Sequence, residues 1–151
     1  MSERDHRYFE EIEVGEEYIS QGRTVTETDI VMFAGLSGDY NVLHTDAEFM
    51  KSSLFGERIA HGLLGVAIQS GLLSRGAPEY AVLAFLGLRW KFKGPIKIGD
   101  TIRAKAKVSG KRETSKPDRG IVTQIRQVFN QREEVVQEGE VDLMVARRPL
   151  P

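Results

Sequence analysis

The chain has 151 residues, of which 40% are hydrophobic and 28% are charged, so it is long enough to fold as one domain with a buried core. Its 21 lysines and arginines nearly balance its 22 aspartates and glutamates, which argues against a nucleic-acid partner and against binding to an anionic membrane surface. The absence of cysteine excludes disulfides, thiolate metal sites and thiol nucleophiles.

The amino-terminal segment MSERDHRYFEEIEVGEE carries charges of both signs, which is not the pattern of a secretory signal or a transit peptide. The longest apolar run, GLLGVAIQSGLL, contains Gln69 and Ser70 and is too short and too polar to span a bilayer. We therefore expect a cytoplasmic protein with one domain over residues 1–151, in which residues 1–10 are flexible.

The first predicted elements are a short strand and a short helix. The strand lies within GEEYISQGRTV, with Tyr18 near its centre and glycines near its ends. The helix lies within TVTETDIVMFAGLSGD, where Thr26 and Asp29 form a pair like a capping box and Gly38 supplies the break. The following TDAEFMKSS predicts one further helical turn, with Asp46 as its cap.

The segment SGDYNVLHTD, residues 37–46, gathers Asp39, Asn41 and His44 in a polar loop after this helix. One interpretation is structural, because aspartate, asparagine and glycine are common turn residues and the histidine is then incidental. The other interpretation is an acid–base pair of Asp39 and His44 presented by the loop. The loop sequence by itself leaves both interpretations open.

A longer helix is predicted from about His61 to Ser74, and its sequence is apolar nearly all round. Each glycine in it costs about 1 kcal/mol relative to alanine, so close packing against neighbouring elements is the expected compensation. We therefore expect this helix to be buried on most of its faces.

Four strands are predicted in the second half of the chain, within YAVLAFLGLRWKFKGP, DTIRAKAKVSGKRE, GIVTQIRQVFNQ and EVVQEGEVDLMVARR. In the first of them Leu88, Trp90 and Phe92 alternate with basic residues, the period of two that is typical of a sheet with one face in water. One strand, then helices, then four strands indicate an α+β domain in which one antiparallel sheet wraps against one buried helix.

Two motifs of the sequence, FAGLSGDYNVLHTD and GERIAHGLL, resemble the signature of MaoC-like hydratases, the (R)-specific enoyl-CoA hydratase family. The resemblance covers residues 33–73 and implies a single hot-dog domain, in which a curved antiparallel sheet wraps around a buried central helix. One position departs from the pattern, because family members often have proline after the asparagine, where this chain has Val42. Proline would stiffen the loop that sets the geometry of Asp39 and His44.

The resemblance implies a hydratase or dehydratase that interconverts 2-enoyl-CoA and (R)-3-hydroxyacyl-CoA thioesters, with no cofactor beyond the coenzyme A of the substrate. Asp39, the favoured base, and His44 would together hold the water that reacts. Gly62 matches the position whose backbone N–H donates to the thioester carbonyl. The first turn of a helix suits this role because its N–H groups are unpaired, and a role of Gly62 in close packing is compatible with it.

Three further residues are candidates for binding substrate, and each has a structural alternative. Asn41 is expected to stabilise the loop by bonding to its backbone, with direct substrate contact as the alternative. His61 either caps the central helix or touches substrate, and a structural role is favoured. Ser70 lies eight residues after Gly62 on about the same helix face. In the resembling hydratases a serine at this offset helps to hold the catalytic aspartate, whereas a buried serine can also bond to its own helix.

Basic residues are candidates for contacting the phosphates of coenzyme A, and the sequence favours none of them: Arg89, Lys91, Lys93, Lys111, Arg112, Lys116 and Arg119. No metal site is predicted, because three histidines without cysteine give no recognisable ligand spacing.

We expect a homodimer or a higher homo-oligomer, because the long predicted sheet has edges that need cover.

Two other functions remain open at this stage. A hot-dog thioesterase is one of them, although such enzymes usually place a carboxylate on or near the central helix and residues 62–76 contain none. A non-catalytic acyl-CoA-binding protein is the other, and Val42 is the feature that favours it. Retention of both Asp39 and His44 favours the enzyme.

Overall fold

The structure, a computed structural model, describes residues 6–76 and 78–149. The elements in chain order are η1 (Phe9–Glu11), β1 (Glu17–Ile19), β2 (Arg23–Thr24), α1 (Glu27–Ser37), α2 (Val42–Thr45), α3 (Ala47–Met50), α4 (Gly62–Gly76), β3 (Val82–Phe92), β4 (Thr101–Glu113), β5 (Arg119–Phe129) and β6 (Val135–Ala146). The predicted order of a strand, helices and four long strands is confirmed. The short helix α2 lies where the sequence predicts a loop.

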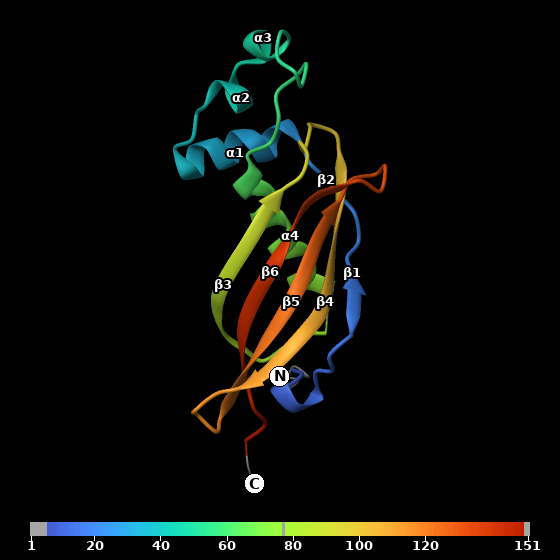
Figure 1. The fold of residues 1–151 in the computed structure, drawn as a ribbon. Helices are drawn as coiled ribbons and strands as arrows, with labels where there is room; N and C mark the ends of the chain where they lie inside the picture. The colour runs from blue at the N-terminus through green and yellow to red at the C-terminus, as the bar shows by residue number, and fades with distance from the viewer. Residues whose placement is uncertain (1–5, 77, 150–151) are drawn as a thin grey trace, which may run out of the picture.

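One antiparallel sheet forms the frame of the molecule, with the strand order β1-β4-β5-β6-β3 and with β2 added to β4. Figure 1 shows the long strands β3 to β6 side by side and curved, with α4 lying along one face of the sheet. Tight hairpins join β4 to β5 and β5 to β6, as antiparallel neighbours allow. The predicted α+β architecture of one sheet against one central helix is therefore present.

Burial along the strands follows the predicted alternation in β4 but not in β3. Ile102, Ala104 and Val108 of β4 are buried, and the residues between them are more exposed. In β3, by contrast, Leu88 and Phe92 are exposed and Trp90 is half-buried. The reason is that β3 is an edge strand of the sheet, so much of its apolar surface has no neighbour within the chain.

Helix α4 supplies the centre of the core, and the expected burial on most of its faces leaves one face uncovered. Leu64 and Ile68 are buried in a cluster with residues of β4, β5 and β6. Close packing explains Gly65, because a Cβ there would overlap the Gln137 side chain. However, one face of α4 is open to solvent in the single chain. Neither α4 nor any other helix in residues 6–76 and 78–149 is long and apolar enough to cross a membrane.

The amino-terminal segment contacts the sheet where the structure describes it, from residue 6 onward. Phe9 and Ile12 are buried in a second core cluster with residues of β4, β5 and β6. Arg7 forms a parallel bridge with Tyr80, just before β3. Burial of two large apolar side chains fixes this segment. Residues 1–5 of the expected flexible stretch lie outside the described part of the chain.

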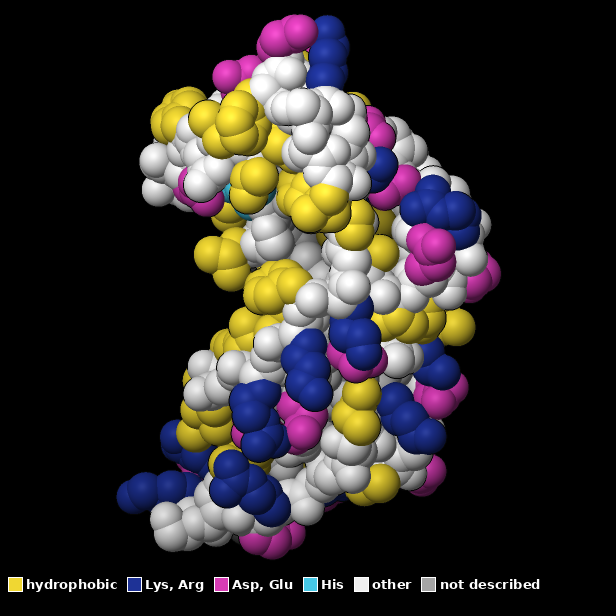
Figure 2. All heavy atoms as spheres, turned by 45° about the horizontal axis from the view of Figure 1, so that its top comes forward, with side chains coloured by type: hydrophobic (Ala, Val, Ile, Leu, Met, Phe, Trp, Pro, Cys, Tyr) yellow, Lys and Arg dark blue, Asp and Glu magenta, His cyan; other side chains and the backbone are white. Residues whose placement is uncertain are grey.

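The segment from α1 to α3 projects from one end of the sheet, opposite the end where η1 lies (Figure 1). Hydrophobic side chains gather on this segment and around the notch below it (Figure 2). Exposed apolar side chains of this segment and of the turn after α3 include Leu36, Tyr40 and Leu54, with exposed fractions of 84%, 63% and 90%. Apolar side chains grouped in this way are typical of a surface that binds an apolar ligand or a protein partner.

Candidate active site

Local capping brings Asp39 close to His44. Helix α1 begins at the predicted capping box of Thr26 and Asp29, and it ends at Gly38, whose left-handed φ of 77° turns the chain. The side-chain oxygen of Asn41 then accepts a hydrogen bond of 3.0 Å from the backbone N–H of Leu43, and this bond caps α2. Asn41 therefore makes the backbone contact expected of a loop-stabilising residue.

His44 has one nitrogen committed to the backbone and the other facing Asp39. Its Nδ1 lies 2.7 Å from the carbonyl oxygen of Ile59, which can only accept, so Nδ1 carries the proton of the neutral ring. The Nε2 atom is then an acceptor, and it lies 4.0 Å from Oδ2 of Asp39. The His44 side chain is 9% exposed and the Asp39 side chain is 52% exposed, so the pair opens to solvent on the aspartate side.

Two acceptor atoms therefore face each other across a gap that is too long for a direct hydrogen bond. A water molecule fits this arrangement, because it can donate one hydrogen to Asp39 and the other to His44. Loss of either proton leaves a hydroxide-like oxygen held between the two side chains. The geometry is therefore suited to activating water by general base catalysis.

His61 contacts both members of the Asp39–His44 pair. Its Nε2 donates to the backbone carbonyl of Asp39 at 2.9 Å, and its ring stacks on that of His44 with centroids 3.7 Å apart. The ring of Phe33 packs against His61 at 4.9 Å. His61 is buried and holds both members of the pair, so the favoured structural role agrees with its contacts.

The structure also brings together three groups that are able to bind a metal. Single ligand atoms of Asp39, His44 and His61 all lie within 4.8 Å of one another, which the sequence spacing did not indicate. The Nε2 of His61 is committed to a backbone carbonyl, however, and the two imidazole rings are stacked at 25°. Lone pairs of stacked rings lie in nearly parallel planes and do not converge on a point between the rings. This arrangement is a poor match to the tetrahedral geometry of a zinc site.

Gly62 is the first residue of α4, and the sequence neighbour of His61, so the helix begins beside the pair. Its N–H has no acceptor within the helix. A Cβ at this position would lie 2.7 Å from Cε1 of the Phe92 ring, so glycine is needed for close approach. The open N–H and the positive end of the helix dipole suit an oxygen that gains negative charge.

Gln137 fixes the first turn of α4 to the sheet, and no sequence motif indicates this role. Its Nε2 donates to the carbonyl of Gly62 at 3.0 Å, and its Oε1 accepts from Nε1 of Trp90 at 3.1 Å. The side chain is buried on β6. The available signal was a glutamine directly after two valines at the start of an apolar strand.

Ser70 does not join the other candidates. It is exposed on α4 and lines a cavity at the other end of the helix. Within the described residues no hydrogen bond joins Ser70 to Asp39 or to the α4 backbone, so neither alternative considered for it is seen. The period of 3.6 residues puts Ser70 on about the same side of α4 as Gly62. The two residues are nevertheless about two helical turns apart along the axis, so Ser70 lies away from the Asp39–His44 pair.

Four of the seven basic candidates for phosphate contact are committed elsewhere. Arg89, Lys93 and Arg119 form ion pairs with glutamate or aspartate side chains, and Lys111 donates to a backbone carbonyl. The remaining three form no ion pair within the described part of the chain: Lys91, Arg112 and Lys116. These three are the basic side chains of that set left free to meet a phosphate.

Comparison with known proteins agrees with the motifs. The family model of the MaoC like domain matches residues 10–129. An (R)-specific enoyl-CoA hydratase of Rhodospirillum rubrum is 36% identical over 93% of this chain and 93% of its own length. A protein of Archaeoglobus fulgius described as a monoamine oxidase regulatory protein superposes with a TM-score of 0.90, at 40% identity over 95% of this chain and 97% of that chain.

The fold is confirmed by a more distant structure. A Mycobacterium tuberculosis protein with a double hotdog fold superposes with a TM-score of 0.82 at 20% identity, over 95% of this chain and 45% of that chain. The sheet and central helix described above are therefore a hot-dog fold. With a family match over most of its length, this chain belongs to the MaoC-like domain family.

Proposed function

We propose that the chain catalyses the reversible addition of water to 2-enoyl-CoA thioesters and yields (R)-3-hydroxyacyl-CoA. The observation that carries the proposal is the pair of acceptor atoms, His44 Nε2 and Asp39 Oδ2, held 4.0 Å apart beside the free N–H of Gly62. The name of the Rhodospirillum rubrum relative supports both the reaction and the configuration of the product.

The residues divide the reaction between them. Asp39 and His44 orient a water and accept a proton from it as its oxygen bonds to the β-carbon of the enoyl group. The electrons of the double bond move toward the thioester oxygen, where the N–H of Gly62 stabilises the developing enolate. The proton then returns to the α-carbon, so that one water has been added and no group is lost.

A thioesterase would need a water directed at the carbonyl carbon, and the observed geometry favours hydration over it. Helix α4 carries no aspartate or glutamate over Gly62–Gly76. Binding of an acyl-CoA without catalysis does not require two acceptor atoms, Asp39 Oδ2 and His44 Nε2, that face each other across a gap the size of a water molecule. We therefore place hydration first, acyl-CoA hydrolysis second and simple binding third.

The test is a spectroscopic assay on purified protein with 2-butenoyl-CoA. Absorbance of the conjugated enoyl thioester should fall while a thiol reagent detects no free coenzyme A. Chiral analysis should find the (R)-3-hydroxy product. Free thiol that rises as the absorbance falls would replace hydration by hydrolysis as the proposed function.

We also propose that the chain works as a homodimer joined through β3. This 11-residue edge strand leaves one row of its backbone groups unpaired, and it exposes apolar side chains such as Phe85 and Phe92. Pairing of β3 with its copy would cover this row and extend the sheet across two subunits. A stable monomer in sedimentation at micromolar concentration would contradict this arrangement.

A further inference from the structure

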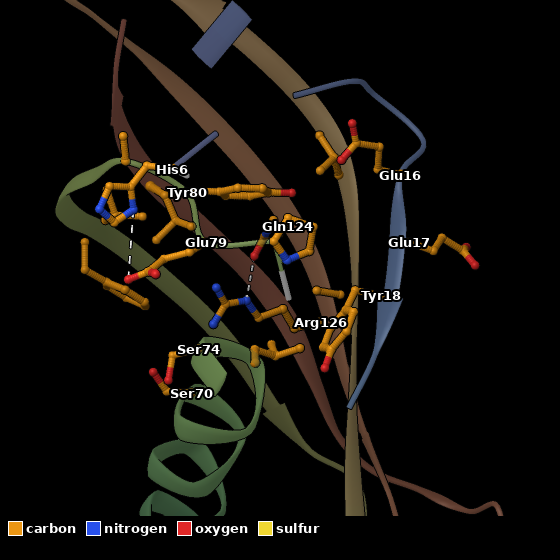
Figure 3. Close-up of a pocket in the computed structure, with 18 residues that line it drawn as sticks. His6, Glu16, Glu17, Tyr18, Ser70, Ser74, Glu79, Tyr80, Gln124 and Arg126 are labelled. Carbon is orange, nitrogen blue, oxygen red and sulfur yellow. Dashed lines mark hydrogen bonds and ion pairs between the residues drawn. The ribbon is translucent and has the colours of Figure 1, made fainter. Parts of the chain in front are cut away.

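A cavity lies at the carboxyl-terminal end of α4, away from the Asp39–His44 pair. Its volume is about 510 Å³, and its walls come from the end of α4, from β1, and from the inner face of β4, β5 and β6. Figure 3 shows the Arg126 side chain projecting into it, with Gln124 and Tyr80 on one side and Ser70 and Ser74 on the other. The catalytic steps above do not use any of these polar groups.

Arg126 is buried, and no carboxylate in residues 6–76 and 78–149 pairs with it. It is 7% exposed, and its Nε donates to the side-chain oxygen of Gln124 at 2.9 Å, while Nη1 makes a long bond of 3.4 Å to that of Gln69. Its Nη2 has no protein acceptor within the described residues. Burial lowers the pKa of Arg126 to about 10, so the side chain is still a cation at neutral pH. A buried charge of this kind lowers stability unless an anion compensates it.

Three acidic side chains line the cavity, and among the described residues none of them forms an ion pair with Arg126. Glu16 pairs with Arg7 at 2.6 Å, Glu17 pairs with Lys105 at 3.1 Å, and Glu79 lies 3.9 Å from Nδ1 of His6. Tyr80 stays protonated, because burial, helped by the negative charge of Glu16, raises its pKa above the ordinary value. Its hydroxyl remains able to donate to an anion. Among the described residues of the lining, the glutamates therefore lie against basic partners of their own, and Arg126 is the cation without a carboxylate beside it.

An open face of α4 connects this cavity to the reaction site. Leu63, Ala67, Ser70 and Ser74 are exposed, and their spacing puts them on one side of the helix. Beside this face, β3 brings Phe92 to Gly62 at one end and Phe85 to the cavity at the other. The stretch from Gly62 to Ser70 or Ser74 spans roughly 12 to 18 Å along the helix axis. An extended acyl chain of medium length covers this distance.

We infer that the cavity binds a carboxylate at the far end of the acyl chain, so the substrates are 2-enoyl and 3-hydroxyacyl thioesters of dicarboxylic acids. The inference rests on the proposed function and names its substrate class. The guanidinium of Arg126, oriented by Gln124 and Gln69, pairs with the carboxylate. One arginine balances the single charge of a carboxylate, whereas a phosphate dianion would leave excess negative charge near Glu16. A terminal methyl group would leave Arg126 uncompensated.

The test compares 2-enoyl-CoA substrates of equal chain length that end in a carboxylate or in a methyl group. For medium-length chains the wild-type protein should favour the carboxylate by roughly 10- to 100-fold in kcat/KM, the scale of a hydrogen bond to a charged group. Arg126→Met should remove this preference and leave hydration of 2-butenoyl-CoA unchanged. Arg126→Lys should keep part of it. Arg103→Met, which removes a half-buried arginine of β4 that pairs with Glu133 and does not line the cavity, should keep all of it.

The outcomes separate the two proposals. If the wild type hydrates no enoyl-CoA of either kind, the proposed function is wrong. If it hydrates 2-butenoyl-CoA but prefers methyl-ended chains, or if the carboxylate preference survives in Arg126→Met, the inference about the cavity is overturned.

A binding measurement covers the case in which Arg126→Met does not fold. Free glutarate should raise the melting temperature of the wild type and should weaken the hydration of carboxylate-ended substrates more than that of 2-butenoyl-CoA. Stabilisation by glutarate with equal, or no, inhibition of both substrates would mean that the cavity binds a free anion only, which also overturns the inference.

Discussion

Replacement of Gln137 by leucine should weaken both the fold and the catalysis, because this side chain joins the first turn of α4 to the sheet. It is 2% exposed, and its amide bonds to the carbonyl of Gly62 at 3.0 Å and to the Trp90 indole N–H at 3.1 Å. Leucine has a similar size but no polar atom. Both contacts are lost, and the indole N–H of Trp90 is left half-buried without its acceptor.

The expected loss of stability follows from the two hydrogen bonds of Gln137. Each contributes about 1 kcal/mol net, and the unsatisfied donor of the half-buried Trp90 costs about 1 kcal/mol more, the lower end of the range for buried groups, so we expect a loss of about 3 kcal/mol in the free energy of unfolding. For a chain of this length that loss lowers the melting temperature by roughly 6–12 °C. The Gly62 N–H is also less well positioned, and misplacement of a catalytic group by about 1 Å costs up to about 100-fold in rate.

Thermal unfolding followed by circular dichroism, together with kcat on 2-butenoyl-CoA, measures both effects. Gln127→Leu is the matched control, because Gln127 on β5 makes only a 3.4 Å bond to Glu138. It should shift stability by no more than about 0.5 kcal/mol. If Gln137→Leu melts and turns over like the control, the argument that this glutamine positions the helix is refuted.

Three further predictions concern the reaction site. Asp39→Asn and His44→Ala should each lower kcat by about 100-fold or more with unchanged circular dichroism. Asp46→Asn, in which asparagine caps α3 equally well, should keep wild-type kcat, and equal loss in all three variants would contradict the assignment. Gly62→Ala keeps the backbone N–H but adds a methyl group that crowds the approach of the thioester oxygen to it, so kcat/KM should fall by roughly 10-fold or more. The variant should melt near the wild type, because the exposed Phe92 ring is able to move away from the new methyl. Treatment with EDTA should leave kcat unchanged, and activity that is lost and then restored by zinc would show that Asp39, His44 and His61 hold a metal.

Local sequence patterns predicted the elements well where a few neighbouring residues decide the structure. The capping box of Thr26 and Asp29 and the cap at Asp46 occur as predicted, because each depends on residues within one helical turn. The period of two correctly gave the inner face of β4. It failed for the burial of β3, because the position of a strand at the edge of a sheet depends on the fold and not on its own sequence.

The reaction site was predicted in part. Asp39 and His44 are close in sequence and lie together in the structure, while the stacking of His61 on His44 joins segments that no local pattern connects. Gln137 and Arg126 were missed for the same reason. Polar residues on a mostly apolar strand form no recognisable sequence motif. Their contacts with α4 depend on how the helix packs against the sheet, which the sequence alone does not reveal.

Ser70 shows the limit of a helical-wheel argument. The period of 3.6 residues placed it near the face of Gly62, but it does not measure distance along the helix axis. The side chain lies near the Arg126 cavity, where it contributes to the inference about the acyl tail and not to the holding of Asp39.

The most direct test of the central claim is hydration of 2-butenoyl-CoA in water labelled with oxygen-18, followed by mass spectrometry of the products. If Asp39 and His44 deliver water to the β-carbon, the label will be found in the 3-hydroxyl group of an intact acyl-CoA, and this product will be nearly absent with Asp39→Asn. Label in the carboxylate of a free acid, with coenzyme A released, would show attack on the carbonyl carbon and would contradict the account.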